Sequence, residues 1–203
     1  MTRRTLPTLA AAACLLPAVA LACPDSLEDS EAGVVVRYDD GVIARLSRDA
    51  DAIVTEDVRY ASSDDGYRTV ALHGLFMIED VDIEDGEAVA ASQERQSFPE
   101  GLELLPDPET GLNWSGTVTV EIADLDPMER RISLGIGSRG EVMIGNCEYE
   151  AWPATLRYED EGEQTVLGYD FLPALGIAIL RSSADIDGEA DLYTPVAISR
   201  VED

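Results

Sequence analysis

The sequence contains no lysine, so all 14 of its basic residues are arginines. It also contains a single histidine, His73, and three cysteines in 203 residues. Without lysine the chain cannot form a Schiff base, supply a P-loop lysine or use a lysine as a general base. With one histidine, a zinc site would have to recruit cysteines as well. These absences exclude more enzyme classes than any motif in the chain adds.

Positive charge is scarce overall. The 14 arginines stand against 41 aspartates and glutamates, which gives a formal net charge of −27 at pH 7. A surface of this kind repels the phosphates of nucleic acids and the anionic faces of membranes. We therefore expect neither as a partner, and we interpret the acidity as a means of keeping the protein soluble.

Long apolar runs are missing everywhere except at the N-terminus. A pair of arginines there precedes an uncharged stretch over residues 6–21, and Ala20 and Ala22 offer small side chains at the two positions that a signal peptidase reads. The stretch is shorter than the roughly 20 residues of a membrane-spanning helix. We predict a signal peptide over residues 1–22 and export to the periplasm or the cell exterior. Residues 23–203 then form a single domain with no integral membrane segment.

The few cysteines are informative because of where they lie. Cys14 leaves with the predicted signal peptide, so Cys23 and Cys147 remain in the exported chain. An even number of cysteines in an oxidising compartment predicts a disulfide between them. Closing so long a loop would contribute on the order of 4 kcal/mol in the chain-entropy model. The alternative is a lipoprotein anchored through Cys23, which would leave Cys147 without a partner.

The rest of the chain alternates between apolar and polar residues in short segments, which is typical of half-buried strands. Residues 34–38 and 42–46 alternate around an Asp-Asp-Gly turn and predict a hairpin, and a longer strand is expected over residues 67–78. The fold class is therefore all-β, an antiparallel barrel or sandwich of about ten strands.

One stretch, from about residue 84 to residue 114, departs from this alternation. Residues 87–96 contain several alanines and predict one short helix. Three prolines, Pro99, Pro106 and Pro108, then prevent regular structure. We interpret residues 84–114 as a long crossover or lid between two halves of one sheet system.

Two motifs resemble binding sites without meeting their requirements. Residues 135–140 read Gly-Ile-Gly-Ser-Arg-Gly, which matches the dinucleotide fingerprint, but the residues that follow predict a strand and not the helix that must hold the pyrophosphate. The acidic stretches at residues 80–86 and 185–191 lack the glycine and glutamate spacing of a calcium-binding EF-hand. The sequence therefore predicts no cofactor and no metal site.

Catalytic residues are not predicted either. The chain has no Gly-x-Ser-x-Gly motif that would place a serine nucleophile beside His73. We therefore predict a structural role for this histidine. Paired carboxylates of the kind that glycosidases use carry no information here, because acidic residues are abundant throughout.

One short stretch has a known counterpart. Residues 171–176, Phe-Leu-Pro-Ala-Leu-Gly, resemble the aromatic-x-Pro-x-Leu-Gly turn of uncharacterised exported β-barrel proteins of Gram-negative bacteria. In those proteins the turn joins two strands late in the chain. The resemblance implies a periplasmic antiparallel barrel, and it brings no catalytic residues with it.

Three functions follow in order of preference. The first is a non-catalytic periplasmic binding or accessory module whose interior holds an apolar ligand under the crossover. The second is a structural or protein-interaction module of the cell envelope with a filled core, and the third is a hydrolase that uses carboxylates. An interior cavity of several hundred Å³ would favour the first over the second.

Overall fold

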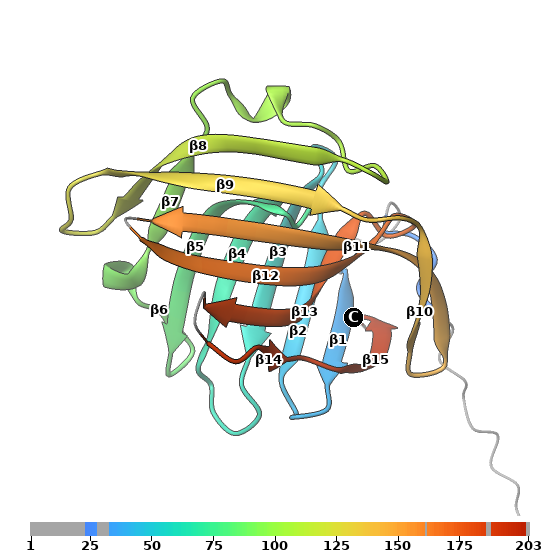
Figure 1. The fold of residues 1–203 in the computed structure, drawn as a ribbon. Helices are drawn as coiled ribbons and strands as arrows, with labels where there is room; N and C mark the ends of the chain where they lie inside the picture. The colour runs from blue at the N-terminus through green and yellow to red at the C-terminus, as the bar shows by residue number, and fades with distance from the viewer. Residues whose placement is uncertain (1–22, 28–32, 161, 186–187, 202–203) are drawn as a thin grey trace, which may run out of the picture.

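The computed structural model describes residues 23–27, 33–160, 162–185 and 188–201, so the predicted signal peptide and Cys14 lie outside it. The described residues form an all-β antiparallel sheet, as predicted (Figure 1). The strands of the first half are β1 (Val34–Tyr38), β2 (Ile43–Arg48), β3 (Ile53–Arg59), β4 (Gly66–Leu72), β5 (Phe76–Glu84), β6 (Glu87–Ala88) and β7 (Glu94–Ser97). Those of the second half are β8 (Asn113–Ile122), β9 (Met128–Ile136), β10 (Gly140–Ile144), β11 (Cys147–Asp160), β12 (Glu163–Leu172), β13 (Ile177–Asp185), β14 (Asp191–Leu192) and β15 (Pro195–Arg200).

Most strands pair with their neighbours in the chain, because short turns join alternating segments. The order across the sheet is β14-β13-β12-β11-β9-β8-β7-β5-β4-β3-β2-β1-β15, with β6 on β5 and β10 on β11. The two edges approach each other through the last segment of the chain. Just after β14, the Tyr193 N–H donates to the carbonyl of Arg181 in β13 at 2.9 Å. The next residue contacts the other edge, where the Asp39 N–H after β1 donates to the Thr194 carbonyl at 3.0 Å. This segment bridges the edges, although no continuous ladder closes the sheet among the described residues.

The sheet curls, so that β8, β9, β11, β12 and β13 cross in front of β1–β5 (Figure 1). Alternate residues of the strands face inward and form two groups of buried apolar side chains. The first core cluster includes Val34, Leu46, Val58, Leu172 and Ile177. The second core cluster includes Phe76, Val118, Ile132, Leu156 and Phe171. Each cluster draws on strands from both halves of the chain.

The expected strand over residues 67–78 is wrong in one respect, because the structure divides it into β4 and β5. His73 and Gly74 have φ angles of 57° and 69°, which a strand cannot accommodate. The Leu75 N–H donates back to the Leu72 carbonyl at 3.0 Å and closes the turn. His73 therefore lies in a hairpin turn and not in the middle of a strand. The hairpin expected over residues 34–46 is confirmed by the pairing of β1 with β2.

The crossover over residues 84–114 contains more regular structure than predicted. The helix expected over residues 87–96 is one turn of 3₁₀ helix, η1 (Ala90–Ser92), between β6 and β7, and a second such turn is η2 (Leu102–Leu104). Strand β7 is hydrogen-bonded between β5 and β8 and so joins the two halves of the sheet. Among the described residues, no helix is long and apolar enough to cross a membrane.

The two glycine-containing turns behave as the sequence indicates. Residues 137–139 connect β9 to β10 without a helix, so the dinucleotide fingerprint is a strand connection. Residues 173–176 connect β12 to β13, and the Gly176 N–H donates to the Leu172 carbonyl at 2.8 Å. This turn therefore joins two strands late in the chain, as the resemblance of residues 171–176 implies.

A glycine substitution tests the packing at the start of β1. Gly33 has a φ of 79°, and a Cβ atom on it would lie 2.1 Å from the Leu46 carbonyl oxygen. Gly86 has a similar φ of 83°, but a Cβ atom there would meet nothing within 4 Å. We expect Gly86→Ala to cost roughly 1 kcal/mol of unfolding free energy for backbone strain alone. Gly33→Ala should cost roughly 2–3 kcal/mol, because the backbone of β2 must also move. Equal losses in urea denaturation would contradict the described register of β1 on β2.

Candidate functional site

An interior cavity of about 310 Å³ lies between the two layers of the curled sheet. Strands β2 to β5 form one wall, and β11 to β13 form the other. Its lining residues are Leu46, Val54, Glu56, Tyr67, Thr69, Ala71, Gly74, Leu75, Met77, Asp80, Asp82, Tyr158, Leu167, Tyr169, Ala178 and Leu180. The volume is in the range of small-molecule sites.

The strand register arranges the lining into a polar part and an apolar part. Glu56, Thr69 and Asp80 are direct partners across β3, β4 and β5, so they form one row on the inner face. Nearer the β4–β5 turn, the corresponding positions on these strands are Val54, Ala71 and Met77. The apolar residues therefore lie at the end of the cavity where the turn closes it. Asp82 both lines the cavity and is exposed, so the acidic part lies toward solvent.

Glu56 is the most unusual residue of the row. Its carboxylate has no hydrogen-bond or ion-pair partner among the described residues, although the residue is half-buried and borders the cavity. Burial raises the pKa of Glu56 to about 7, and the negative charges of Asp80 and Asp57 add to the shift. Asp80 differs, because it accepts a hydrogen bond of 2.5 Å from the Thr69 hydroxyl. Burial nevertheless raises the pKa of Asp80 as well, against the effect of that hydrogen bond.

Three tyrosines complete the polar part of the lining. Tyr67 comes from β4, Tyr158 from β11 and Tyr169 from β12, and burial raises the pKa of all three phenols. Their hydroxyls make no hydrogen bond within the part of the chain that the structure describes. These hydroxyls and the Glu56 carboxyl belong to half-buried residues that line the cavity, so a molecule in the cavity can supply their hydrogen bonds. The cavity is therefore suited to a small molecule or to water.

One basic side chain beside the lining residue Tyr158 is already neutralised. Arg130 of β9 forms ion pairs with Glu94 and with Asp160, the latter at 2.8 Å between Nε and Oδ2. Its guanidinium also lies 5.5 Å from the ring centroid of Tyr158. Arg130 does not itself line the cavity, and the lining includes no basic residue. The charge that faces the cavity is thus wholly negative.

His73, the sole histidine, lies beside this site without taking part in it. Its Nε2 is 3.3 Å from Oδ1 of Asp107, whereas its neighbours Gly74 and Leu75 line the cavity. Burial lowers the pKa of His73, although the Asp107 carboxylate acts against this shift. The described residues contain no group of three His, Cys, Asp or Glu side chains that could hold a metal ion.

The site residues themselves were missed in the sequence. Asp80 and Asp82 were considered only as part of an acidic turn, and the structure places both within β5, facing the cavity. Glu56 was one acid among 41. The local signal was a carboxylate on the otherwise apolar face of a strand, between Val54 and Val58, which are both buried.

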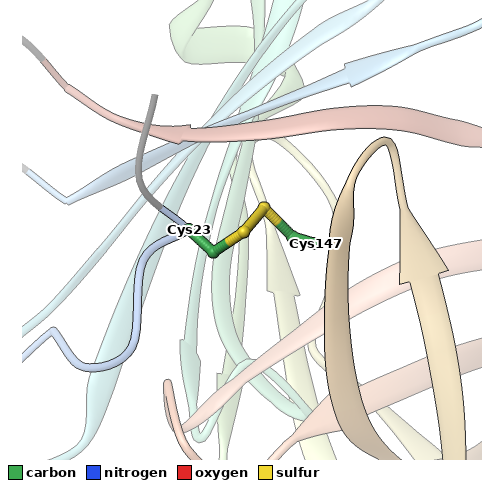
Figure 2. The surroundings of a disulfide bond; sticks show 2 residues. All are labelled: Cys23 and Cys147. Atoms are coloured by element: carbon green, nitrogen blue, oxygen red, sulfur yellow. A yellow bond between two sulfur atoms is a disulfide. The ribbon is translucent and has the colours of Figure 1, made fainter. Parts of the chain in front are cut away.

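The predicted cysteine pair lies at another place in the molecule. The structure joins Cys23 and Cys147 by a disulfide with a Cα–Cα distance of 5.6 Å, across 124 residues of sequence. Figure 2 shows that it links the N-terminal segment to the hairpin of β10 and β11. Neither cysteine lines the interior cavity.

The predicted ligand cavity under the crossover can be compared with the cavities of the structure. The lining of the interior cavity includes no residue of 84–114, because the walls come from the curled strands themselves. A second cavity of about 300 Å³ does lie between the crossover and β8, where Phe98, Leu104, Leu105 and Trp114 line it. The crossover therefore lines a different cavity from the interior one.

Comparison with known proteins gives one distant likeness. A search of solved structures finds the hypothetical lipoprotein YmcC from Escherichia coli (K12), with a TM-score of 0.42 and 10% identity, covering 81% of this chain and 86% of that one. No family model matches the chain, and no curated protein matches it. At so low a TM-score the likeness supports no conclusion about function. The resemblance of residues 171–176 to exported Gram-negative proteins remains a prediction.

Proposed function

We propose that this protein is an exported, non-catalytic binding module that holds a small ligand with an apolar part in its interior cavity. The observation that carries the proposal is the cavity of about 310 Å³ between the two core clusters. A structural module with a filled core would have no reason to keep this volume, because protein interiors are otherwise close-packed. The predicted signal peptide and the disulfide support an oxidising location.

The lining agrees with a binding function in its chemistry as well as in its size. Ligand sites are mostly apolar with a few convergent polar groups, and this cavity combines Leu75, Met77 and Leu180 with the Glu56 row. The Thr69 hydroxyl does donate to the Asp80 carboxylate, but His73 does not join this pair, because it contacts Asp107 instead. A hydrolase that uses carboxylates therefore has less support than a binding module.

A cavity-filling substitution tests the proposal. We expect tert-butylbenzene, an apolar probe, to bind the native protein and to shift the NMR signals of residues that line the interior cavity. Leu167→Trp should weaken this binding at least about tenfold, because the larger side chain occupies cavity volume. Leu192→Trp is the matched control, since Leu192 is 77% exposed and does not line the cavity. Binding of tert-butylbenzene that is equal in Leu167→Trp and Leu192→Trp would contradict the proposed function.

A further inference from the structure

The charges of the interior cavity say more about the ligand than its volume does. The lining contains three carboxylates, Glu56, Asp80 and Asp82, and no arginine. Arg130 could have offered a positive charge, but its ion pairs with Glu94 and Asp160 already use it. An anionic ligand would therefore meet only repulsion at the polar part of the cavity.

Glu56 supplies an independent reason to expect a cation. A half-buried carboxylate without a partner is costly to ionise, and the charges of Asp80 and Asp57 add repulsion. Asp57 has Arg68 as a partner at 2.7 Å on the other face of β3, and Asp80 has the Thr69 hydroxyl. Glu56 has neither, and it borders a space large enough for a ligand group. A positive charge placed there would satisfy the carboxylate and reduce its repulsion with Asp80.

The tyrosines around the row suit the same kind of ligand. Tyr67, Tyr158 and Tyr169 surround the polar part, and aromatic rings attract cations over their faces. Their hydroxyls can also accept hydrogen bonds from an ammonium group. The apolar end near Leu75 and Met77 requires a hydrocarbon part on the same molecule.

We propose that the ligand is an amphipathic cation, an amine or quaternary ammonium group attached to an apolar body, whose charge is held by Glu56. This inference rests on the proposed binding function and adds the ligand class and the residue that selects it. The hydrocarbon body lies toward the β4–β5 turn, and the charged group lies beside the carboxylate row. Asp82 at the outer side of the row gives an entering cation a second carboxylate.

Three probes of similar size separate the charge from the shape. Phenyltrimethylammonium has the shape of tert-butylbenzene with a positive charge, and benzenesulfonate carries a negative charge on a similar body. At pH 8 we expect phenyltrimethylammonium to bind at least about tenfold more tightly than tert-butylbenzene, which corresponds to about 1.4 kcal/mol. Benzenesulfonate should bind more weakly than either. Isothermal titration calorimetry at fixed ionic strength measures all three affinities.

The variant Glu56→Gln should abolish most of the preference for phenyltrimethylammonium over tert-butylbenzene. Asp57→Asn is the matched control, because it removes the neighbouring charge from the outer face of the same strand. It should keep the preference. The preference for the cation should also fall as the pH is lowered through about 7, because Glu56 then gains a proton. The titratable groups around Glu56 are Asp80, Asp57 and the phenols of Tyr38, Tyr67 and Tyr169.

The outcomes distinguish the two proposals. If tert-butylbenzene binds as tightly as phenyltrimethylammonium, the cavity is a binding site but the cation inference is wrong. The inference is also wrong if Glu56→Gln and Asp57→Asn change the preference equally. If none of the three probes binds, the proposed function itself fails.

Discussion

Replacing Cys147 by serine should lower the free energy of unfolding by about 2–5 kcal/mol and the melting temperature accordingly. The bridge to Cys23 spans 124 residues, so reduction frees a very long loop in the unfolded chain. The chain-entropy model assigns roughly 4–5 kcal/mol to a loop of this length. That is a large share of the roughly 5–15 kcal/mol that holds an ordinary domain together.

The folded state would change at one place as well. The bridge holds residues 23–27 against the β10–β11 hairpin, where Leu27 is buried in the first core cluster (Figure 2). Asp25 in the same segment forms an ion pair of 2.8 Å with Arg200 at the end of β15. A chain terminus without such an attachment frays readily. Loss of the bridge should therefore release Leu27 from the core before the rest of the sheet unfolds.

Thermal denaturation of the native protein, of Cys147→Ser and of the dithiothreitol-reduced native protein measures this effect. The two treatments should lower the melting temperature by similar amounts, and reduction of Cys147→Ser should do nothing further. Two free thiols titrated in the unreduced protein would contradict the pairing. Intact-mass measurement on the exported protein should find a chain that begins at Cys23 and carries no lipid, because one sulfur atom cannot form both a thioether and a disulfide.

Glu56→Gln should stabilise the protein by about 2–3 kcal/mol at pH 8 and change its stability little at pH 4. The pKa of Glu56 is raised from 4.5 to about 7, mainly by burial and further by the negative charges of Asp80 and Asp57. A shift of this size corresponds to at most about 3 kcal/mol between the charged and the neutral form. Glutamine keeps the shape of the protonated side chain and cannot ionise.

The direction of the pH dependence follows from which state holds the proton. Between pH 4.5 and about 7 the folded protein keeps a proton on Glu56 that the unfolded chain has already released. The folded state therefore binds more protons in this range, and the contribution of Glu56 to stability falls as the pH rises. Below pH 4.5 Glu56 is neutral in both the folded and the unfolded state. Above about pH 7 it is charged in both states, and the full destabilisation by its burial is present.

Urea denaturation at a series of pH values would give the free energy of unfolding of the native protein and of Glu56→Gln, and the difference between them tests the prediction. Asp57→Asn provides the control for a general reduction of the negative charge, because its carboxylate lies on the outer face of β3 and pairs with Arg68. A gain from Glu56→Gln that is the same at pH 4 and pH 8 would show that burial does not perturb this carboxyl. Groups that destabilise the fold in this way are concentrated at functional sites, which agrees with the binding role.

Local features of the chain were predictable because they depend on neighbouring residues. The hairpin of β1 and β2 follows from two alternating segments around an Asp-Asp-Gly turn. The strand that begins at residue 140, where a dinucleotide site would need a helix, was also predictable from the residues next to it. The break at His73 was missed because a histidine with positive φ has no strong sequence signal, although Gly74 beside it was a hint.

By itself, the sequence determined the all-β class, the alternation of buried and exposed positions, and which two cysteines pair. Each of these depends on residue type and on spacing along one strand or on a count over the chain. Only the tertiary structure decided that Glu56 and Asp80 lie in one row, with Thr69 between them, in a cavity that Tyr158 and Tyr169 also line. The physical reason is that the curl and the register of the sheet bring together residues that are far apart in the chain. The environment of Glu56, and hence its raised pKa, exists only once those strands have met.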